Sequence, residues 1–142
     1  MIYLASDHRG YNLKEKLKQW LSEWGYDHED MGALKYDQDD DYPDFISKAA
    51  EKVSDDPVNS RGIILGGSGQ GEAMVANRYK GVRAAVYYGG SEEIIKLSRE
   101  HNDANVLSLG ASFVDDETAQ RAVKLWLEVP FSGEERHKRR IE

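Results

Sequence analysis

The stretch Arg-Gly-Ile-Ile-Leu-Gly-Gly-Ser-Gly-Gln-Gly-Glu, residues 61–72, joins a short apolar run to a glycine-rich loop. Residues 61–65 predict a central buried strand, because short apolar runs bounded by turn residues are typical of one. We expect the loop to lead into a short helix that reaches about Tyr79. Glycine permits positive φ, so several backbone N–H groups of the loop can point at one spot where the helix begins. Such a loop favours a negative charge, either a bound phosphate or an oxyanion that forms during a reaction.

Glu72 helps to distinguish between these two anions. No Gly-Lys-Ser/Thr follows the loop, so it is not a Walker loop, and Glu72 stands where a dinucleotide fingerprint has its final glycine. A carboxylate would repel a pyrophosphate there, whereas beside a transient oxyanion it can act as the general base. The alternative is that Glu72 only complements the dipole of the helix start. Spacing alone leaves both interpretations open.

Strand-like and helix-period segments alternate on both sides of this stretch. Strands are expected over residues 2–6, 26–30, 61–65, 82–88 and 105–109, the second of them nearer an edge. Besides the short one, helices are expected after a cap at Asn12, from Pro43, from a cap at Ser91 to Glu100, and over residues 116–128. This alternation predicts an α/β fold, a three-layer αβα Rossmann-like domain with a five-stranded parallel sheet, and a single domain over residues 1–142.

The segments that follow the strands are the expected place of a site. Ligands of open parallel sheets bind beyond the carboxyl ends of the strands. We therefore expect residues 7–10, 66–72, 89–90 and 110–112 to converge.

Composition narrows the functional classes. The 142 residues are 39% hydrophobic and 32% charged, with no cysteine and a net charge of −7. No apolar run approaches the about 20 residues of a membrane-spanning helix, and the N-terminus lacks the features of a signal peptide. A nucleic-acid partner is disfavoured because it needs a broad basic face, whereas a small phosphorylated metabolite needs only a few local cations. We expect a cytoplasmic protein without disulfides.

The histidines and acidic residues give weaker signals. Asp7-His8 leaves the first strand at the expected site and can move a proton or hold sugar hydroxyls, although in isolation an ordinary strand-end turn is slightly favoured. His101 alone is typical of a helix C-terminal cap. No histidines have metal-ligand spacing, so we predict no metal. The acidic cluster between Asp37 and Asp44 lacks the pattern of a calcium loop and is expected to be a solvated loop.

The segment Arg136-His137-Lys138-Arg139-Arg140 is the densest positive charge of the chain. A solvated basic tail is the usual interpretation of such a run. If the segment is helical, Arg136 and Arg140 share one face, which would suit a phosphate clamp.

Taken together, these residues resemble the ribose-5-phosphate isomerase B family, which also contains galactose-6-phosphate and allose-6-phosphate isomerases. The motifs that carry the resemblance are, in family order, Ser6-Asp7-His8, Asp41-Tyr42-Pro43, Gly66 to Glu72 with Ala76-Asn77, Ser98 to Val106, and Arg136-His137 with Arg140. Each motif is modest alone, but the set spans essentially the whole chain and is specific.

The resemblance implies a Rossmann-like homodimer, or a tetramer, with shared active sites and with neither metal nor nucleotide cofactor. It implies that Glu72 is the base, that Asp7 and His101 assist opening of the furanose ring, and that Ser68 belongs to the catalytic loop. His8, Tyr42 and Asn102 would bind the sugar, and the amides around Gly67, Ser68, Gly69 and Gly71 would hold an enediolate. Arg136, His137 and Arg140, in a tail over about residues 130–142, would bind phosphate in the neighbouring subunit's site.

Two departures from the family pattern concern the base and the phosphate. Many members have a catalytic cysteine at the position of Gly66, whereas this chain matches the branch that uses a glutamate at 72. Members usually carry an arginine where this chain has Ser112, and a small residue where it has Arg9. We hypothesise that Arg9 replaces the missing cation from the opposite wall of the site.

The expected function is isomerisation of ribose 5-phosphate to ribulose 5-phosphate through an enediolate. The first alternative is an isomerase of a six-carbon sugar phosphate, such as allose 6-phosphate or galactose 6-phosphate. A non-catalytic module that binds a nucleotide or phosphate is a second, and Glu72 argues against it. A subunit that depends on a different partner chain is a third, and the presence of every motif in one chain argues against that.

Overall fold

The computed structural model describes all 142 residues as one five-stranded sheet flanked by helices. The strands are β1 (Ile2–Ser6), β2 (His28–Asp30), β3 (Arg61–Gly66), β4 (Ala84–Tyr87) and β5 (Val106–Gly110). They lie in the order β2-β1-β3-β5-β4, and every neighbouring pair is parallel. The predicted parallel α/β fold is therefore confirmed, with the strand at 61–66 in the centre and the weak second strand at an edge.

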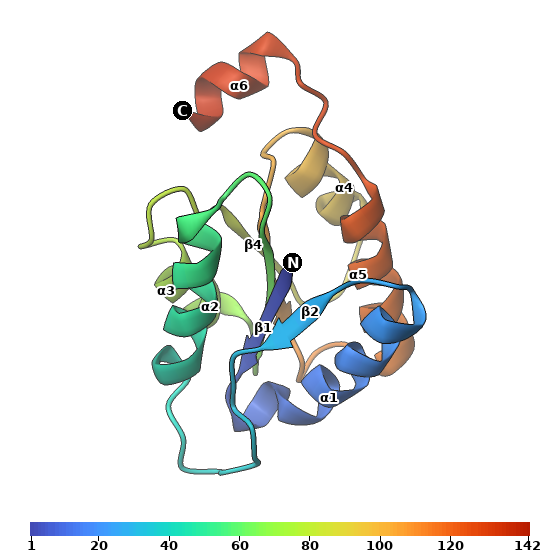
Figure 1. Cartoon of the computed structure of the whole chain (residues 1–142). Coiled ribbons are helices and arrows are strands. Elements are labelled where there is room, and N and C mark those ends of the chain that lie inside the picture. The colour runs from blue at the N-terminus through green and yellow to red at the C-terminus, as the bar shows by residue number, and fades with distance from the viewer.

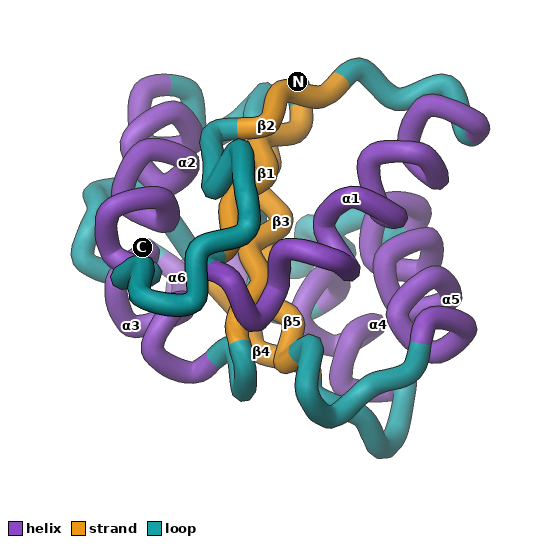
Figure 2. Tube along the Cα trace, turned by 90° about the horizontal axis from the view of Figure 1, so that it is seen from below, coloured by secondary structure: helices purple, strands orange, loops and turns teal.

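The helices form a layer on each face of the sheet (Figures 1 and 2). The helices are α1 (His8–Glu23), α2 (Pro43–Asp55), α3 (Gln70–Ala76), α4 (Glu93–Glu100), α5 (Asp116–Glu128) and α6 (Glu135–Ile141). Helices α2 and α3 cover one face, and α1, α4 and α5 cover the other. Two apolar clusters fill the spaces between these layers: Leu17, Leu65 and Trp126 belong to the first, and Ile46 and Ile64 to the second. Helix α6 stands apart at one end of the molecule (Figure 1).

Helix α1 begins earlier than the sequence predicted. The carboxylate of Asp7 accepts hydrogen bonds from the backbone N–H groups of Arg9 (3.0 Å) and Gly10 (3.3 Å), so Asp7, not Asn12, is the N-cap. The reason is position: Asp7 follows β1 directly, and its side chain reaches the free N–H groups of the first turn. The helix ends as expected before Gly25, whose φ is +82°.

Helix α3 ends at Ala76 rather than near Tyr79. The side chain of Asn77 explains this end, because its Oδ1 accepts from the N–H of Ala84 (2.8 Å) and its amide donates to the carbonyl of the same residue (3.2 Å). These two bonds join the end of α3 to the start of β4. At the other predicted cap, Ser91 Oγ accepts from the N–H of Glu93, where α4 begins.

The sheet order places the expected site at one edge. Strands β1 and β3 are neighbours at the centre of this order. From the end of β1 the chain crosses to β2 on one side, whereas from the end of β3 it crosses to β4 on the other side. The register pairs Ser6 with Leu65 and Gly66 with Gly110, so these three strands end at the same level. The loops that follow them therefore converge, as predicted from the rule that ligands bind beyond the carboxyl ends of parallel strands.

No helix of the chain is both long enough and apolar enough to cross a membrane.

Candidate active site

The glycine loop lies between the ends of β3 and β5. Gly69 is the N-cap residue of α3 and has a φ of +81°. Residues with a side chain adopt this backbone conformation only with strain. Its carbonyl accepts a 2.6 Å hydrogen bond from the buried hydroxyl of Ser108 in β5, and the N–H of Gln70 donates to Ser68 Oγ (3.3 Å). A side chain at Gly69 would meet the backbone of Leu109 at 3.0 Å. The loop is thus held in one conformation against the neighbouring strand.

Glu72 lies in the first turn of α3 and is buried, with 4% of its surface exposed. Burial raises the pKa of its carboxyl, and the negative charge of Asp7 acts in the same direction. The backbone N–H groups of Glu72 itself and Gly69, together with the charge of Arg9, oppose that rise without cancelling it. A carboxylate with a raised pKa beside a row of main-chain amides is suited to accept and return a proton.

Gly66 makes room for that carboxyl group. A Cβ atom built on Gly66 would overlap the carboxyl carbon and both carboxyl oxygens of Glu72. Any side chain at position 66 therefore requires Glu72 to move. Glycine at 66 and glutamate at 72 thus form one steric unit.

Tyr42 closes the loop from the side of α2. A Cβ on Gly71 would lie 2.6 Å from the hydroxyl oxygen of Tyr42, so the phenol rests directly on the loop backbone. Pro43 starts α2 immediately after this residue, which fixes the point where the tyrosine leaves the chain. The sequence placed Tyr42 among the sugar-binding residues, and it does lie against the glycine loop.

Asp7, His8 and Asp40 form a tight group at the start of α1. One donor atom of each lies within 4.8 Å of the others, and no other group of the chain is spaced closely enough to ligate a metal. His8 Nδ1 lies 2.7 Å from Asp40 Oδ1, which is a hydrogen-bond distance. The group is therefore arranged as a histidine–carboxylate pair beside a second carboxylate.

Asp40 corrects one sequence prediction. The acidic cluster was expected to be a solvated loop, and Asp37, Asp39 and Asp41 are indeed exposed. The side chain of Asp40, in contrast, is only 7% exposed and accepts from both the backbone N–H and the ring of His8. The reason is tertiary: the loop before α2 folds back over the start of α1.

Arg9 lies at the corner formed by the glycine loop and the end of β5. A Cβ on Gly67 would lie 3.0 Å from Arg9 Nη1 and 3.7 Å from Ser112 Oγ. Arg9 and the serine that stands where the family pattern has an arginine thus both border Gly67. The side chain of Arg9 reaches this corner from the β1 side of the site.

A second group of site residues lies around the connection between α4 and β5. The rings of His101 and His137 stack with centroids 4.2 Å apart and planes 17° from parallel. The N–H of Ser132 donates to the carbonyl of Glu100 (3.1 Å), so the chain before α6 is tied to the end of α4. The tail is helical, which is the condition under which Arg136 and Arg140 share one face.

The histidine stack affects the charge of His137. Burial lowers the pKa of His137, and electrostatic interactions with His101 and Arg136 lower it further. Its Nε2 lies 3.3 Å from a carboxylate oxygen of Glu134 but without hydrogen-bond geometry. Asn102 and Arg140 line one cavity of about 340 Å³ beside this stack.

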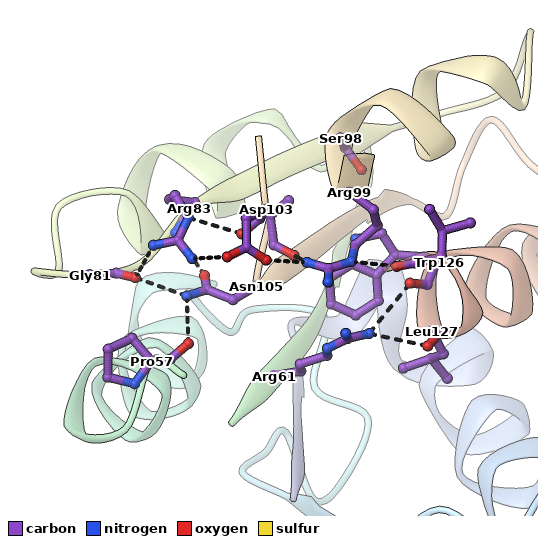
Figure 3. Close-up of polar contacts among 12 residues, drawn as sticks. Pro57, Arg61, Gly81, Arg83, Ser98, Arg99, Asp103, Asn105, Trp126 and Leu127 are labelled. Carbon is purple, nitrogen blue, oxygen red and sulfur yellow. Dashed lines mark hydrogen bonds and ion pairs between the residues drawn. The ribbon is translucent and has the colours of Figure 1, made fainter. Parts of the chain in front are cut away.

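A network of three arginines holds this second group in place (Figure 3). Asp103 bridges Arg83 and Arg99 through ion pairs of 3.4 and 2.9 Å. Arg99 also donates to the carbonyl of Val129 (3.0 Å), and Arg61 donates to two carbonyls at the end of α5. The loop with His101 and Asn102 lies between Arg99 and Asp103, so the network fixes both that loop and the exit of the tail.

The two groups lie at opposite ends of the sheet within one chain (Figure 1). The glycine loop follows β3, whereas His101 and Asn102 precede β5, and Gly62 of β3 pairs with Val106 of β5. Four strand residues at about 3.3 Å each separate Gly62 from Gly66, which is roughly 13 Å. Glu72, Asp7, His8, Arg9, Tyr42 and Ser68 are therefore brought together, but His101, Asn102, Arg136, His137 and Arg140 are not brought to them by their own chain.

Sequence reasoning missed two residues of the first group, Ser108 and Asp40. A serine inside an apolar strand is a signal that it has a polar partner, because a buried hydroxyl without one is costly. Asp40 had no such signal, since nothing local distinguishes it from the exposed aspartates around it.

Comparison with known proteins agrees with this architecture. A family model for ribose/galactose isomerases matches residues 2–142. A ribose-5-phosphate isomerase B of Mycobacterium tuberculosis is 41% identical over 141 residues, which cover 99% of this chain and 85% of the relative.

Solved structures show the same fold. The ribose-5-phosphate isomerase B of Mycoplasma genitalium, solved with bound ribulose 5-phosphate, aligns with a TM-score of 0.94 at 40% identity and covers 99% of this chain and 90% of that one. The enzyme of Clostridium thermocellum aligns with a TM-score of 0.91 at 41% identity, with 99% and 91% covered. The chain belongs to the ribose/galactose isomerase family.

Proposed function

We propose that this chain is an aldose–ketose isomerase that interconverts ribose 5-phosphate and ribulose 5-phosphate, with Glu72 as the proton-transferring base. The observation that carries the proposal is the buried carboxyl of Glu72 beside the glycine loop, with its raised pKa. The Mycoplasma genitalium relative, 40% identical, binds the ketose of this pair. The proposed reaction needs no cofactor, and the expected compartment stays the cytoplasm.

The proton moves between two neighbouring carbons of the open-chain sugar. Glu72 removes the proton from C2 of the aldose, the electron pair moves toward the carbonyl at C1, and an enediolate forms. Return of the proton to C1, together with transfer of the hydroxyl proton from O2 to O1, gives the ketose. A carboxyl whose pKa is raised toward neutrality serves both steps, because it must accept the proton and then release it. Asp7 and His101 are proposed to open the furanose ring first.

The negative charge of the enediolate is the main energetic difficulty. The loop supplies main-chain N–H groups from Gly67 to Gly71, held by Ser108 and by the positive φ of Gly69. One donor of this kind contributes roughly 2.7–4 kcal/mol in other enzymes. Several preorganised amides can therefore supply much of the rate acceleration.

The complete site is proposed to need two copies of the chain. Glu72, His8 and Tyr42 lie at one end of the sheet, and the cationic tail with His101 and Asn102 lies at the other. A two-fold homodimer would bring the second group of one chain to the first group of its partner. Large apolar side chains that are exposed in the single chain are consistent with an interface, among them Leu34, Met74 and Phe113.

Arg9 is proposed to bind the phosphate group together with Arg136, His137 and Arg140 of the partner copy. Its position next to Gly67, which Ser112 also borders, supports this role, because Arg9 supplies a cation at that corner from the start of α1. Replacing Arg9 by Ala should raise KM for ribose 5-phosphate by about 10- to 100-fold, since hydrogen bonds between charged groups contribute about 1.5–3 kcal/mol. The exposed Arg78 is the matched control, and Arg78→Ala should leave KM unchanged. An unchanged KM in Arg9→Ala would remove Arg9 from the site.

The experiment that tests the function is a panel of substrates offered to the purified, chelator-treated protein. Ribose 5-phosphate, allose 6-phosphate and galactose 6-phosphate are assayed in parallel, together with a thermal-shift screen of the same compounds and of nucleotides. We expect turnover of ribose 5-phosphate that survives chelation. Turnover of a six-carbon sugar alone, or stabilisation by nucleotides without any turnover, would contradict the proposal.

The same panel tests the base. Glu72→Gln should still bind the sugar phosphate but lose about 10²- to 10⁴-fold in kcat, the usual contribution of a general base. Retained turnover would eliminate Glu72 from that role.

A further inference from the structure

Asp40 differs from the other aspartates of its acidic loop, because its carboxylate is buried and contacts His8. Its side chain is 7% exposed, whereas its neighbours Asp39 and Asp41 are exposed. Its Oδ1 accepts from the backbone N–H of His8 at 3.0 Å and lies 2.7 Å from His8 Nδ1. Its Oδ2 is buried and has no hydrogen-bond partner. All the hydrogen bonds of this buried carboxylate therefore go to one residue.

The chemistry of the pair assigns the ring proton of His8. An ionised carboxylate can only accept hydrogen bonds, so the nitrogen that faces it must carry the hydrogen. Nδ1 of His8 is that nitrogen. Nε2 has no protein partner and is not enclosed, so it is the nitrogen that remains available to a ligand.

The surroundings hold the ring in this orientation. The ring of Tyr36 meets the ring of His8 edge-on, with centroids 6.2 Å apart, and Tyr36 in turn packs edge-on against Tyr11. A carboxylate oxygen of Asp7 lies within 4.8 Å of the pair. His8 is thus oriented by the loop before α2 on one side and faces Asp7 of the proposed active site.

We propose that Asp40 is a positioning residue: it fixes the proton of His8 on Nδ1 and so presents Nε2 to the substrate. The proposal rests on the proposed function, because it takes His8 as a residue that binds the sugar phosphate. Asp40 itself does not touch substrate in this scheme. Histidines that bind ligands commonly have their other ring nitrogen fixed in this way by a carboxylate.

The direct test reads the proton itself. Nitrogen-15 NMR of the histidine rings, at a pH where the ring of His8 is neutral and with His8→Gln used to assign its signals, distinguishes the protonated from the unprotonated nitrogen. We expect Nδ1 of His8 to be protonated and Nε2 to be unprotonated. A wild-type spectrum with the proton on Nε2 would overturn the proposal, and this measurement depends on neither turnover nor a variant of Asp40.

Asp40→Ala is the sharpest variant, because both contacts to His8 are made by one oxygen, Oδ1, and alanine removes it. An asparagine could keep its carbonyl oxygen in that place and still accept from both groups, so it would not test the proton position. In Asp40→Ala the ring proton should no longer be fixed on Nδ1, and KM for ribose 5-phosphate should rise by about tenfold with a smaller change in kcat, since the lost contact is a hydrogen bond. An unchanged tautomer and an unchanged KM would each contradict the proposal.

Two further variants test whether Asp40 acts through His8 rather than through its charge alone. Asp39→Ala removes an equal charge from the same loop but from an exposed side chain, so it should alter neither the tautomer nor KM. Combining His8→Gln with Asp40→Ala should raise KM no further than His8→Gln alone, because Asp40 acts through His8; additive effects would contradict the proposal. If the wild-type protein turned over none of the sugars, the proposed function would fail, but the tautomer measurement would still stand on its own.

Discussion

At the scale of single residues, the burial of Glu72 should be visible in protein stability. Burial raises the pKa of this carboxyl, so the folded state holds its proton more tightly than the unfolded state does. Stability from this group is then present at low pH and is lost as pH rises through the raised pKa. Glu72→Gln should therefore have a higher Tm than the wild type at pH 7, and the difference should vanish below about pH 4, near the ordinary pKa of a glutamate.

The control for this prediction is Glu51→Gln, which removes an exposed carboxyl of α2. It should leave Tm nearly unchanged at both pH values. A Glu72→Gln protein that is less stable than the wild type at pH 7 would show that the ionised carboxylate is stabilised in the folded state.

The steric unit of Gly66 and Glu72 gives a second prediction at this scale. Gly66→Ala places a methyl group where the carboxyl of Glu72 lies, and a flexible side chain can move away at little cost. The variant should fold with a Tm close to that of the wild type and lose about 10²-fold or more in kcat, because the proposed base is displaced. Circular dichroism melting and steady-state kinetics measure the two effects.

Gly62→Ala is the matched comparison, because it adds the same methyl to the same strand. Its new Cβ would meet Val106 and Val53 at 3.2 and 3.3 Å, far from the glutamate. It should lower stability slightly and leave kcat intact. If both variants lost activity equally, the steric explanation would be wrong.

At the scale of elements, the glycine loop depends on a neighbouring strand. Ser108 of β5 donates to the carbonyl of Gly69 at 2.6 Å, and both groups are buried. Ser108→Ala should cost about 1–3 kcal/mol in the free energy of unfolding, because that carbonyl loses a partner in the interior. The kcat should fall as well, since the amides of the loop would no longer be held in one conformation.

Ser54→Ala is the control that distinguishes the loss of stability from the loss of kcat expected for Ser108→Ala. Ser54 also donates to a distant carbonyl, that of Lys80 at 2.7 Å, but from a helix away from the loop. Denaturant unfolding and kinetics on both variants should show lost activity only for Ser108→Ala. Full activity in Ser108→Ala would mean that the loop keeps its conformation without this bond.

The helices and strands themselves were largely predictable from the sequence. The helix over residues 116–128 and the strand at 2–6 have the predicted bounds, because the first has a helical apolar period and the second is a short apolar run that is buried along its length. The predicted start of α1 was wrong by several residues, since a cap depends on where the preceding strand releases the chain. The prediction for the acidic loop was wrong at Asp40 because its partner, His8, lies 32 residues earlier in the chain.

At the scale of the whole molecule, the division of the site between two copies can be tested by mixing inactive chains. Glu72→Gln lacks the proposed base, and His101→Ala lacks a residue of the second group. In a two-fold dimer of one chain of each kind, one of the two sites has both native residues. Chains that exchange at random should recover about a quarter of wild-type activity, because half of the dimers are mixed and each has one intact site.

The mass of the protein in solution, measured by light scattering, accompanies this experiment. A monomer with full activity would contradict the shared site. No recovery from mixing, in dimers that are shown to exchange subunits, would place both residues in the same copy.

The sequence by itself determined the alternation of strands and helices, the parallel sheet, the glycine loop and the family, because each depends on local periodicity or on motifs of neighbouring residues. Only the tertiary structure decided that Gly66 makes room for Glu72, that Ser108 holds the glycine loop and Asp40 contacts His8, and that His101 with the tail lies at the far end of the sheet from Glu72. The physical reason is that contacts between distant segments depend on strand order and on how loops fold over one another, and neither is written into the period of any single element.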